Sequence, residues 1–574
     1  MIGALPIFLF YFRIFHIYLY KMLILAYTLL ALLAIYFISY SYKKISQRSQ
    51  REELKRDWGK PKNSRYIDID SVENYFLNTI TESADKLQLI SDKIAVDLYL
   101  NDVFKLVDRT TSRIGQQFLY ARLRTIDKNT DALLVQDAFA DMIAADEQLR
   151  LDTQVSLLKL QKNDSYYFQD LIYAKKIDRP SFMPLIYLLS LLNIAFLIAG
   201  IFIPAFFLAF GAVFIINSGI HYWNKNNVSV HTSSLGEFLK AFETAKKLNA
   251  DQKIAAHFPT TEALLKELTP LKRKMIGVKL DNMAEGDAAV VGFMLFELLK
   301  IAFNIEIISF YSIIDSLRAR KESLKELFKF IGVVDTGISI ASFRDSLDEY
   351  CKPVFSTENG LHTKGIKHPL IENCVSNNLS LDDKNLLLTG SNMSGKTTFI
   401  RSVGVNMILG QTLRTCLATE FSMPYAKIFS SITIADSLLE EKSYYFEEMR
   451  IIKEFIQESS SASPCFFILD EIFKGTNTIE RVSAGKAILS YLAGNNNLVF
   501  VSTHDTELNE LLKASYDHYH FSESIADEEL VFDHKIKKGP LKTRNAIRIL
   551  EINDYPASII ADANATVDLF MKTE

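Results

Sequence analysis

The sequence has little of what marks several common classes of protein. Its 574 residues contain only 4 cysteines, which are widely spaced and form no C-x-x-C pair. Neither a zinc site nor a disulfide framework is therefore expected, and we predict reduced thiols in a cytosolic domain. The formal net charge of −4 gives no basic footprint for a polyanion, so any nucleic-acid surface must be local. Internal repeats are also lacking, whereas the length predicts more than one domain.

Charged residues are absent from two long segments, of which the first runs from Met22 to Tyr40. About 20 apolar residues cross a bilayer core, so we predict an N-terminal membrane segment over 1–45 with a span at 22–40. A basic cluster, Lys43 to Arg56, follows it. A cleavable signal peptide would have a shorter apolar region and a small-residue cleavage site, which we do not find. Residues 1–20 leave three alternatives open, namely an interfacial helix, an additional span, or an upstream extension if translation starts at Met22.

The second uncharged segment, residues 183–220, is too long for a single span. One helix of that length would rise about 57 Å, roughly twice the hydrocarbon thickness. Gly200 and Pro204 lie near its middle, where a turn is needed, so we predict a transmembrane hairpin. The alternative is a buried hairpin in a soluble core. Basic residues flank both uncharged segments, which by the positive-inside rule predicts a multi-pass protein of the inner (cytoplasmic) membrane, in contact with lipid, with its polar parts in the cytoplasm.

The polar segments on either side of the hairpin show helical periodicity. Apolar residues recur at i, i+3, i+4 and i+7 in two stretches, which predict amphipathic helices with one buried stripe. The first stretch contains Leu235, Phe238, Leu239 and Phe242, and the second contains Leu317, Leu324, Leu327, Phe328 and Ile331. We therefore predict an all-α domain made of residues 46–182 and 221–355, interrupted by the hairpin.

From about Asn385 onward, short apolar strands alternate with helices, which is typical of a parallel α/β sheet. The strand Asn385–Thr389 runs into a G-x-x-x-x-G-K-T loop and then into a helical stretch. Such a loop wraps phosphates with backbone N–H groups, so we predict a P-loop ATPase domain over 356–574 that binds ATP and Mg²⁺. Lys396 would reach the outer phosphates and Thr397 would ligate Mg²⁺. The predicted nucleotide-binding residues of the loop are Gly390, Ser391, Asn392, Met393, Ser394, Gly395, Lys396, Thr397 and Thr398.

Two further strands end in residues that can carry chemistry. The strand Cys465–Leu469 precedes Asp470 and Glu471, and an acid in this position emerges beside the phosphates. We predict that Asp470 helps to hold Mg²⁺ and that Glu471 orients or deprotonates water. The strand Leu498–Ser502 leads to His504, a predicted γ-phosphate sensor. The predicted catalytic residues are thus Lys396, Glu471 and His504, in the strand order of the ABC-like ATPases.

These stretches resemble the MutS family of DNA mismatch-repair ATPases. T-G-S-N-M-S-G-K-T-T at 389–398 is similar to the family's Walker A loop, and D-E-I-F-K-G-T-N-T at 470–478 resembles its Walker B extension. S-Y-Y-F-E-E-M at 443–449 resembles a segment that approaches the nucleotide of the opposite subunit. D-R-T-T-S-R-I-G at 108–115 looks like the start of the family's helical core. The transporter signature L-S-G-G-Q is absent.

The resemblance implies a homodimer formed through the ATPase domains, with Ser443 contacting the nucleotide in trans and His520 stacking on adenine. It also implies DNA binding and mismatch repair. No F-x-E wedge occurs near the N-terminus, however, and the hairpin at 183–220 falls where the family's DNA clamp is inserted. We therefore predict a membrane-anchored MutS-like ATPase without mismatch preference. The alternatives are a nucleotide-gated membrane scaffold that scarcely hydrolyses ATP, and an ABC-type transporter; no protein partner can be named.

Overall fold

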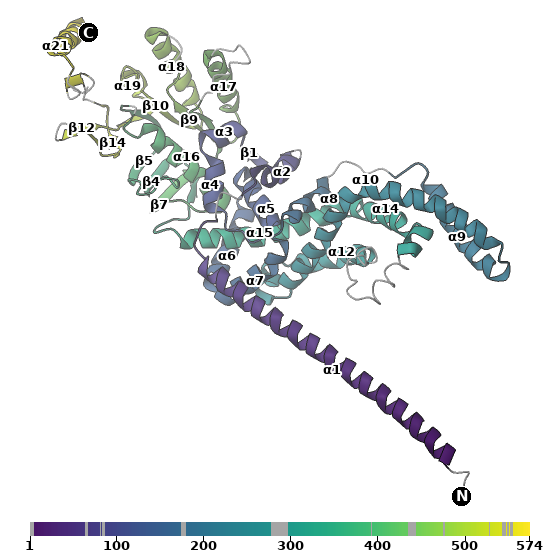
Figure 1. Ribbon diagram of the computed structural model, residues 1–574. Helices are drawn as coiled ribbons and strands as arrows, with labels where there is room; N and C mark the ends of the chain where they lie inside the picture. The colour runs from purple at the N-terminus through teal and green to yellow at the C-terminus, as the bar shows by residue number, and fades with distance from the viewer. Residues whose placement is uncertain are drawn as a thin grey trace.

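The protein has a helical body that carries an α/β domain at one end and two helical projections directed away from that domain (Figure 1). The computed structural model describes residues 5–62, 67–80, 82, 86–173, 179–276, 297–391, 393–433, 444–473, 477–526, 529–541, 547, 550–551 and 555–573.

The first projection is a single helix, α1 (Leu5–Arg56), which leaves the body alone (Figure 1). No proline or glycine occurs between Ile7 and Arg56, so nothing ends the helix at the predicted boundary near residue 45. Its last turns pack on α7 (Glu147–Leu157), where Lys55 lies 2.7 Å from Glu147. Described apolar side chains within the predicted span, such as Tyr27 and Phe37, are about 70% exposed.

The second projection is a hairpin of α9 (Met183–Phe202) and α10 (Phe206–Leu248). Its turn falls between Gly200 and Phe206, as the sequence predicts. Met183–Phe202 and Phe206–Trp223, with mean hydropathy of 2.4 and 1.4, are long and apolar enough to cross a membrane by length and composition. Unlike the predicted hairpin, α10 does not end near residue 220 but continues as one helix into the body.

The body is organised around α15 (Lys321–Asp345), which packs against α5 (Arg113–Leu123) and α6 (Asp131–Ala145). The two predicted apolar stripes are confirmed, since Phe238 of α10 and Leu324 of α15 are fully buried in one continuous core. The other elements of the body are α2 (Ile69–Thr79), β1 (Lys86–Leu89), α3 (Asp92–Asp97), α4 (Leu100–Val107), β2 (Thr125–Asp127), α8 (Asp170–Tyr173), α11 (Gln252–His257), α12 (Thr261–Ile276) and α14 (Ile305–Arg318).

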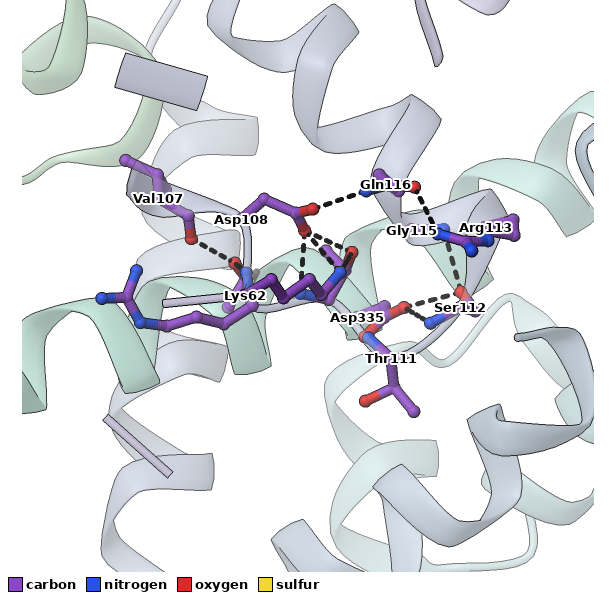
Figure 2. A network of polar contacts seen from close by, with 12 residues as sticks. Lys62, Val107, Asp108, Thr111, Ser112, Arg113, Gly115, Gln116 and Asp335 are labelled. Atoms are coloured by element: carbon purple, nitrogen blue, oxygen red, sulfur yellow. Dashed lines mark hydrogen bonds and ion pairs between the residues drawn. The ribbon is translucent and has the colours of Figure 1, made fainter. Parts of the chain in front are cut away.

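A buried polar network joins the start of α5 to the middle of α15 (Figure 2). The Asp335 carboxylate accepts hydrogen bonds from the backbone N–H groups of Thr111 and Ser112 and from the Ser112 hydroxyl, at 2.6 to 2.8 Å. Burial raises the pKa of Asp335 to about 6. Burial alone would also raise the pKa of Asp108, but the Lys62 ammonium at 2.8 Å and hydrogen bonds from the Thr110 and Gln116 side chains outweigh it and lower that pKa.

Gly115 is the glycine on which this junction depends, because a Cβ at this position would lie 2.2 Å from Asp335 Oδ2. We expect Gly115→Ala to reduce the free energy of unfolding by about 3 kcal/mol, through overpacking and loss of buried hydrogen bonds. Gly211→Ala is the control, since a Cβ there meets nothing within 4 Å. The measurement is the melting temperature of each detergent-solubilised variant, and equal temperatures for the two would contradict the prediction.

The α/β domain contains a six-stranded sheet in the order β14-β11-β6-β10-β9-β8. All neighbours are parallel except β14, which is antiparallel to β11. These strands are β6 (Asn385–Thr389), β8 (Lys427–Ser431), β9 (Cys465–Asp470), β10 (Leu498–Thr503), β11 (Tyr516–His520) and β14 (Lys537–Lys538). The expectation of a mainly parallel α/β sheet is therefore confirmed, and the four cysteines are free.

Helices and smaller sheets surround this central sheet. The helices are α16 (Lys396–Leu413), α17 (Tyr444–Glu458), α18 (Thr478–Leu492) and α19 (Leu508–Leu512), whereas α21 (Ala557–Thr573) lies apart from the sheet at the C-terminal end of the chain (Figure 1). A four-stranded sheet in the order β3-β7-β4-β5 is formed by β3 (Val354–Ser356), β4 (Leu361–Ile366), β5 (Asn377–Leu381) and β7 (Glu420–Pro424). A two-stranded sheet is formed by β12 (Glu523–Ala526) and β13 (Glu529–Phe532).

Two arginines of the body hold the C-terminal end of α16. Arg122 of α5 donates to the carbonyl of Thr412 at 3.0 Å. Arg344 of α15 donates to the carbonyls of Leu413 and Arg414, at 3.2 and 3.0 Å. The last carbonyls of a helix carry its negative dipole end, so guanidinium groups suit this position. The α/β domain is thereby fastened to two separate helices of the body.

Candidate functional site

The glycine-rich loop connects β6 to α16 and lies at the carboxyl edge of the parallel sheet. Every residue of β6 is buried, which places the loop at a fixed point between the neighbouring strands β10 and β11. Gly390 and Gly395 have φ angles of 147° and 111°, a region that L side chains rarely adopt. A Cβ on Gly390 would also lie 2.8 Å from the carbonyl of Phe521. The two glycines of the motif are therefore required by the backbone.

Lys396 begins α16 and folds back over the loop. Its ammonium donates to the carbonyls of Gly390 and Ser391 at 2.7 and 2.9 Å and lies 3.4 Å from His504 Nε2. Lys396 is only 2% exposed, so the loop encloses a positive charge at the N-terminal end of a helix. This combination favours an anion.

The two predicted metal ligands lie in direct contact. The Thr397 hydroxyl donates to Asp470 Oδ2 at 2.7 Å, which joins the first turn of α16 to the end of β9. The Ser502 hydroxyl, on β10, donates to the other oxygen of Asp470. A hydroxyl and a carboxylate this close form a hard oxygen pair of the kind that Mg²⁺ prefers.

Glu471 and His504 also meet, although they follow different strands. Glu471 Oε1 lies 3.0 Å from His504 Nε2. The carboxylate of Asp505, the residue after His504, accepts hydrogen bonds from Arg481 Nε and Nη2, the shortest at 2.6 Å. Arg481 and Asp505 were not singled out from the sequence, because ion pairs between a helix and a loop have no local pattern.

A cavity of about 280 Å³ lies beside the loop. Its wall includes Gly395, Thr397 and Thr398 from the loop and helix, together with Phe521 and His534. The His534 ring lies 3.1 Å from the Ser394 carbonyl and stacks on Phe532, with their planes at 20°. The remaining residues around the cavity are Ile366, Ile371, Asn373, Cys374, Val375, Asn377, Met393, Phe399 and Ser402.

His520, the residue expected to stack on adenine, does not line this cavity. It lies on β11, where its Nδ1 is 2.8 Å from the carbonyl of Gly539. The aromatic side chains that line the cavity are those of His534, Phe399 and Phe521. Both histidines lie on or just after short strands near the C-terminus, so the sequence offered no means of choosing between them.

The other predicted residues of the loop are placed as follows. The Ser391 hydroxyl donates a hydrogen bond to the Glu523 carboxylate, and the Ser394 hydroxyl donates one to the carbonyl of Ser391. The Met393 side chain is exposed. Asn392 and Ser443 lie outside the residues that the structure describes.

Comparison with known proteins shows that the region containing this site is similar to a known family. Residues 386–571 match the family described as MutS domain V. The DNA mismatch repair protein MutS of Listeria welshimeri is 30% identical over 279 residues, 46% of this chain and 32% of the relative. MutS of Listeria innocua is 31% identical over 259 residues, 43% and 30% of the two chains. MutS of Staphylococcus epidermidis is 29% identical over 282 residues, which make up 47% of this chain and 32% of the relative.

MutS domain V is the ATPase domain of MutS, so the C-terminal part of this chain is an α/β domain of that class. Residues 386–571 therefore belong to the MutS domain V family, and the similarity to the MutS relatives covers just under half of this chain. The chain spans about a third of the length of the curated relatives that it matches.

Proposed function

We propose that the protein is a membrane-anchored, MutS-like ATPase that binds ATP with Mg²⁺ and hydrolyses it. The observation that carries the proposal is the meeting, at one edge of one sheet, of groups from three segments far apart in the sequence. Lys396 and Thr397 follow β6, Asp470 and Glu471 end β9, and His504 follows β10, with contacts of 2.7 to 3.4 Å between them. The grouping of a glycine loop with its lysine, a hydroxyl–carboxylate pair and a glutamate–histidine pair supports nucleotide binding and hydrolysis.

Each residue has a role that its position supports. Lys396 would neutralise phosphate charge, and Thr397 and Asp470 would hold Mg²⁺. The described residues contain no group of three or more His, Cys, Asp or Glu placed to hold a metal ion. Mg²⁺ would therefore take its remaining ligands from nucleotide phosphates and water. Glu471 would accept the proton of the attacking water, with His504 beside it.

His534 is the proposed contact for the adenine base. Its ring lines the cavity next to Thr398 and is held between Phe532 and the loop carbonyl of Ser394. An aromatic face in this position can stack on a purine. The overall proposal is tested by ATP hydrolysis of the purified, detergent-solubilised chain, which chelation of Mg²⁺ with EDTA must abolish.

The membrane part of the proposal is supported by exposed apolar surface on both projections. On α9 and α10, Leu191 and Leu208 are 64% and 82% exposed, and Met183–Phe202 is only 28% buried. A soluble core helix would bury most of such a surface. Lipid would cover it, with the α/β domain directed away from the bilayer, and the family resemblance supports a homodimer through the nucleotide sites.

A nucleotide-gated scaffold with little hydrolysis is the second candidate, favoured by the hairpin that occupies the place of the DNA clamp.

Mismatch recognition is not expected to accompany the ATPase. Duplex affinity comes from many phosphate contacts and specificity from groove contacts or induced bending. The chain has a net charge of −4, and no F-x-E motif occurs near its N-terminus. We expect equal binding of homoduplex and single-mismatch oligonucleotides at physiological salt, with and without ATP. A mismatch preference of about tenfold, some 1.4 kcal/mol, would restore a repair role.

A further inference from the structure

The backbone that presents Glu471 is unusual. Glu471 and Phe473 both have positive φ angles, 55° and 61°, in the left-handed region that non-glycine residues rarely occupy. Each such residue costs on the order of 1 kcal/mol and persists only where its surroundings hold it. On one side, the N–H of Glu471 donates to the carbonyl of Ser502 at 2.8 Å, which ties the turn to β10.

The other side of the turn is held by Glu448, a residue that has no part in the site described above. Its Oε1 accepts a hydrogen bond from the N–H of Phe473 at 2.6 Å. Glu448 is 2% exposed, and a carboxylate this deeply buried is costly unless it makes such bonds. The contact joins α17 to the turn, two residues after the proposed base.

α17 is itself packed firmly on this part of the sheet. Its buried residues Ile451, Ile452 and Phe455 share a core cluster with Ile472 and Phe473. The Phe455 ring lies 5.1 Å from that of Phe467 on β9. A shift of α17 relative to the sheet would therefore move the Glu448 carboxylate relative to the turn that carries Glu471.

We propose that Glu448 is a positioning residue for ATP hydrolysis, which holds the Phe473 N–H and thereby fixes the left-handed turn that aims Glu471 at His504. Turnover then depends on where α17 lies. α17 begins at Tyr444, directly after the predicted trans contact Ser443, so a second copy of the chain that engages this end of the helix would act on the same turn. This inference rests on the proposed ATPase function.

The test compares Glu448→Ala, which removes the acceptor, with Glu448→Gln, which keeps a carbonyl oxygen for the Phe473 N–H. Glu454→Ala is the matched control, because Glu454 is an exposed glutamate of the same helix. Full-length protein in detergent is assayed for ATP affinity, for the number of nucleotide sites and for kcat per site. We expect Glu448→Ala to lower kcat about 10- to 100-fold at nearly unchanged ATP affinity, as for a small misplacement of a catalytic group. Glu448→Gln and Glu454→Ala should stay within about threefold of wild type.

Expressing kcat per nucleotide site separates positioning from partial unfolding, which would reduce the number of sites instead. If Glu448→Ala binds no nucleotide, Glu448→Ser takes its place with the same expected result, since its hydroxyl is too short to reach Phe473. If Glu448→Ala hydrolyses ATP at the wild-type rate in an assay where Glu471→Gln is slow, the role of Glu448 is overturned but the proposed ATPase function is not. Equal losses in Glu448→Gln and Glu448→Ala would also overturn the role of Glu448. Absence of hydrolysis by the wild type would instead remove the proposed function.

Discussion

Glu471→Gln should bind ATP as well as the wild type does but hydrolyse it at least about 10²-fold more slowly. The amide keeps the size of the side chain and can still face His504 Nε2, which lies 3.0 Å from Glu471 Oε1. It cannot accept the proton of the attacking water, and general-base catalysis contributes roughly 10² to 10⁴ in rate. Nucleotide affinity and single-turnover hydrolysis are the two measurements. Equal hydrolysis by this variant and the wild type would exclude Glu471 as the base.

Lys396→Ala should impair ATP binding, the step that precedes hydrolysis. The Lys396 ammonium is buried within the loop, so its removal takes away the positive charge that would face the phosphates, together with one donor to each of the Gly390 and Ser391 carbonyls. We expect ATP affinity to fall by about tenfold or more, some 1.4 kcal/mol. Lys384→Ala is the control, because Lys384 precedes β6 at the opposite end of the strand. Similar affinity in both variants would argue against the phosphate cradle.

Another large effect concerns extraction of the protein from cells. We expect the full-length protein to sediment with membranes and to stay there in high salt, entering solution only with detergent. Salt screens charge interactions but does not weaken hydrophobic burial of uncharged helices. The basic residues that follow the span, Lys43 to Arg56, would contribute only a salt-sensitive attraction to anionic lipid. Recovery of intact protein in the soluble fraction without detergent would exclude the transmembrane interpretation and leave α9 and α10 as a surface for another protein.

The local parts of the fold could be predicted from the sequence because they depend on local patterns. Strand, glycine loop and helix follow one another at 385–413, and the turn between α9 and α10 falls at a glycine and a proline. Helix ends without such signals were not predictable. α1 and α10 each continue past the point where hydrophobicity ends, since no residue there stops a helix.

The site shows the same division. Lys396, Thr397, Asp470, Glu471 and His504 each follow a strand, and parallel strands bring such residues to one edge. His534 and Glu448 reach the site by long-range packing: His534 lies beside the loop from beyond β13, and Glu448 reaches the turn from α17. Nothing in the spacing of either residue indicates this. Conformation was equally hidden, because a positive φ at Glu471 is imposed by its neighbours.

Hydrogen bonds hold α16 at both of its ends. Its first residue, Lys396, donates to the glycine-rich loop, while Arg122 and Arg344 donate to its last carbonyls. A displacement of Lys396 by a bound nucleotide would be transmitted along α16 to α5 and α15. By thermodynamic linkage, a ligand that binds the helical body and favours that displaced position would in turn raise ATP affinity. Because α10 runs unbroken from the hairpin into that body, the proposed membrane anchoring would couple the lipid surroundings of the hairpin to the same displacement.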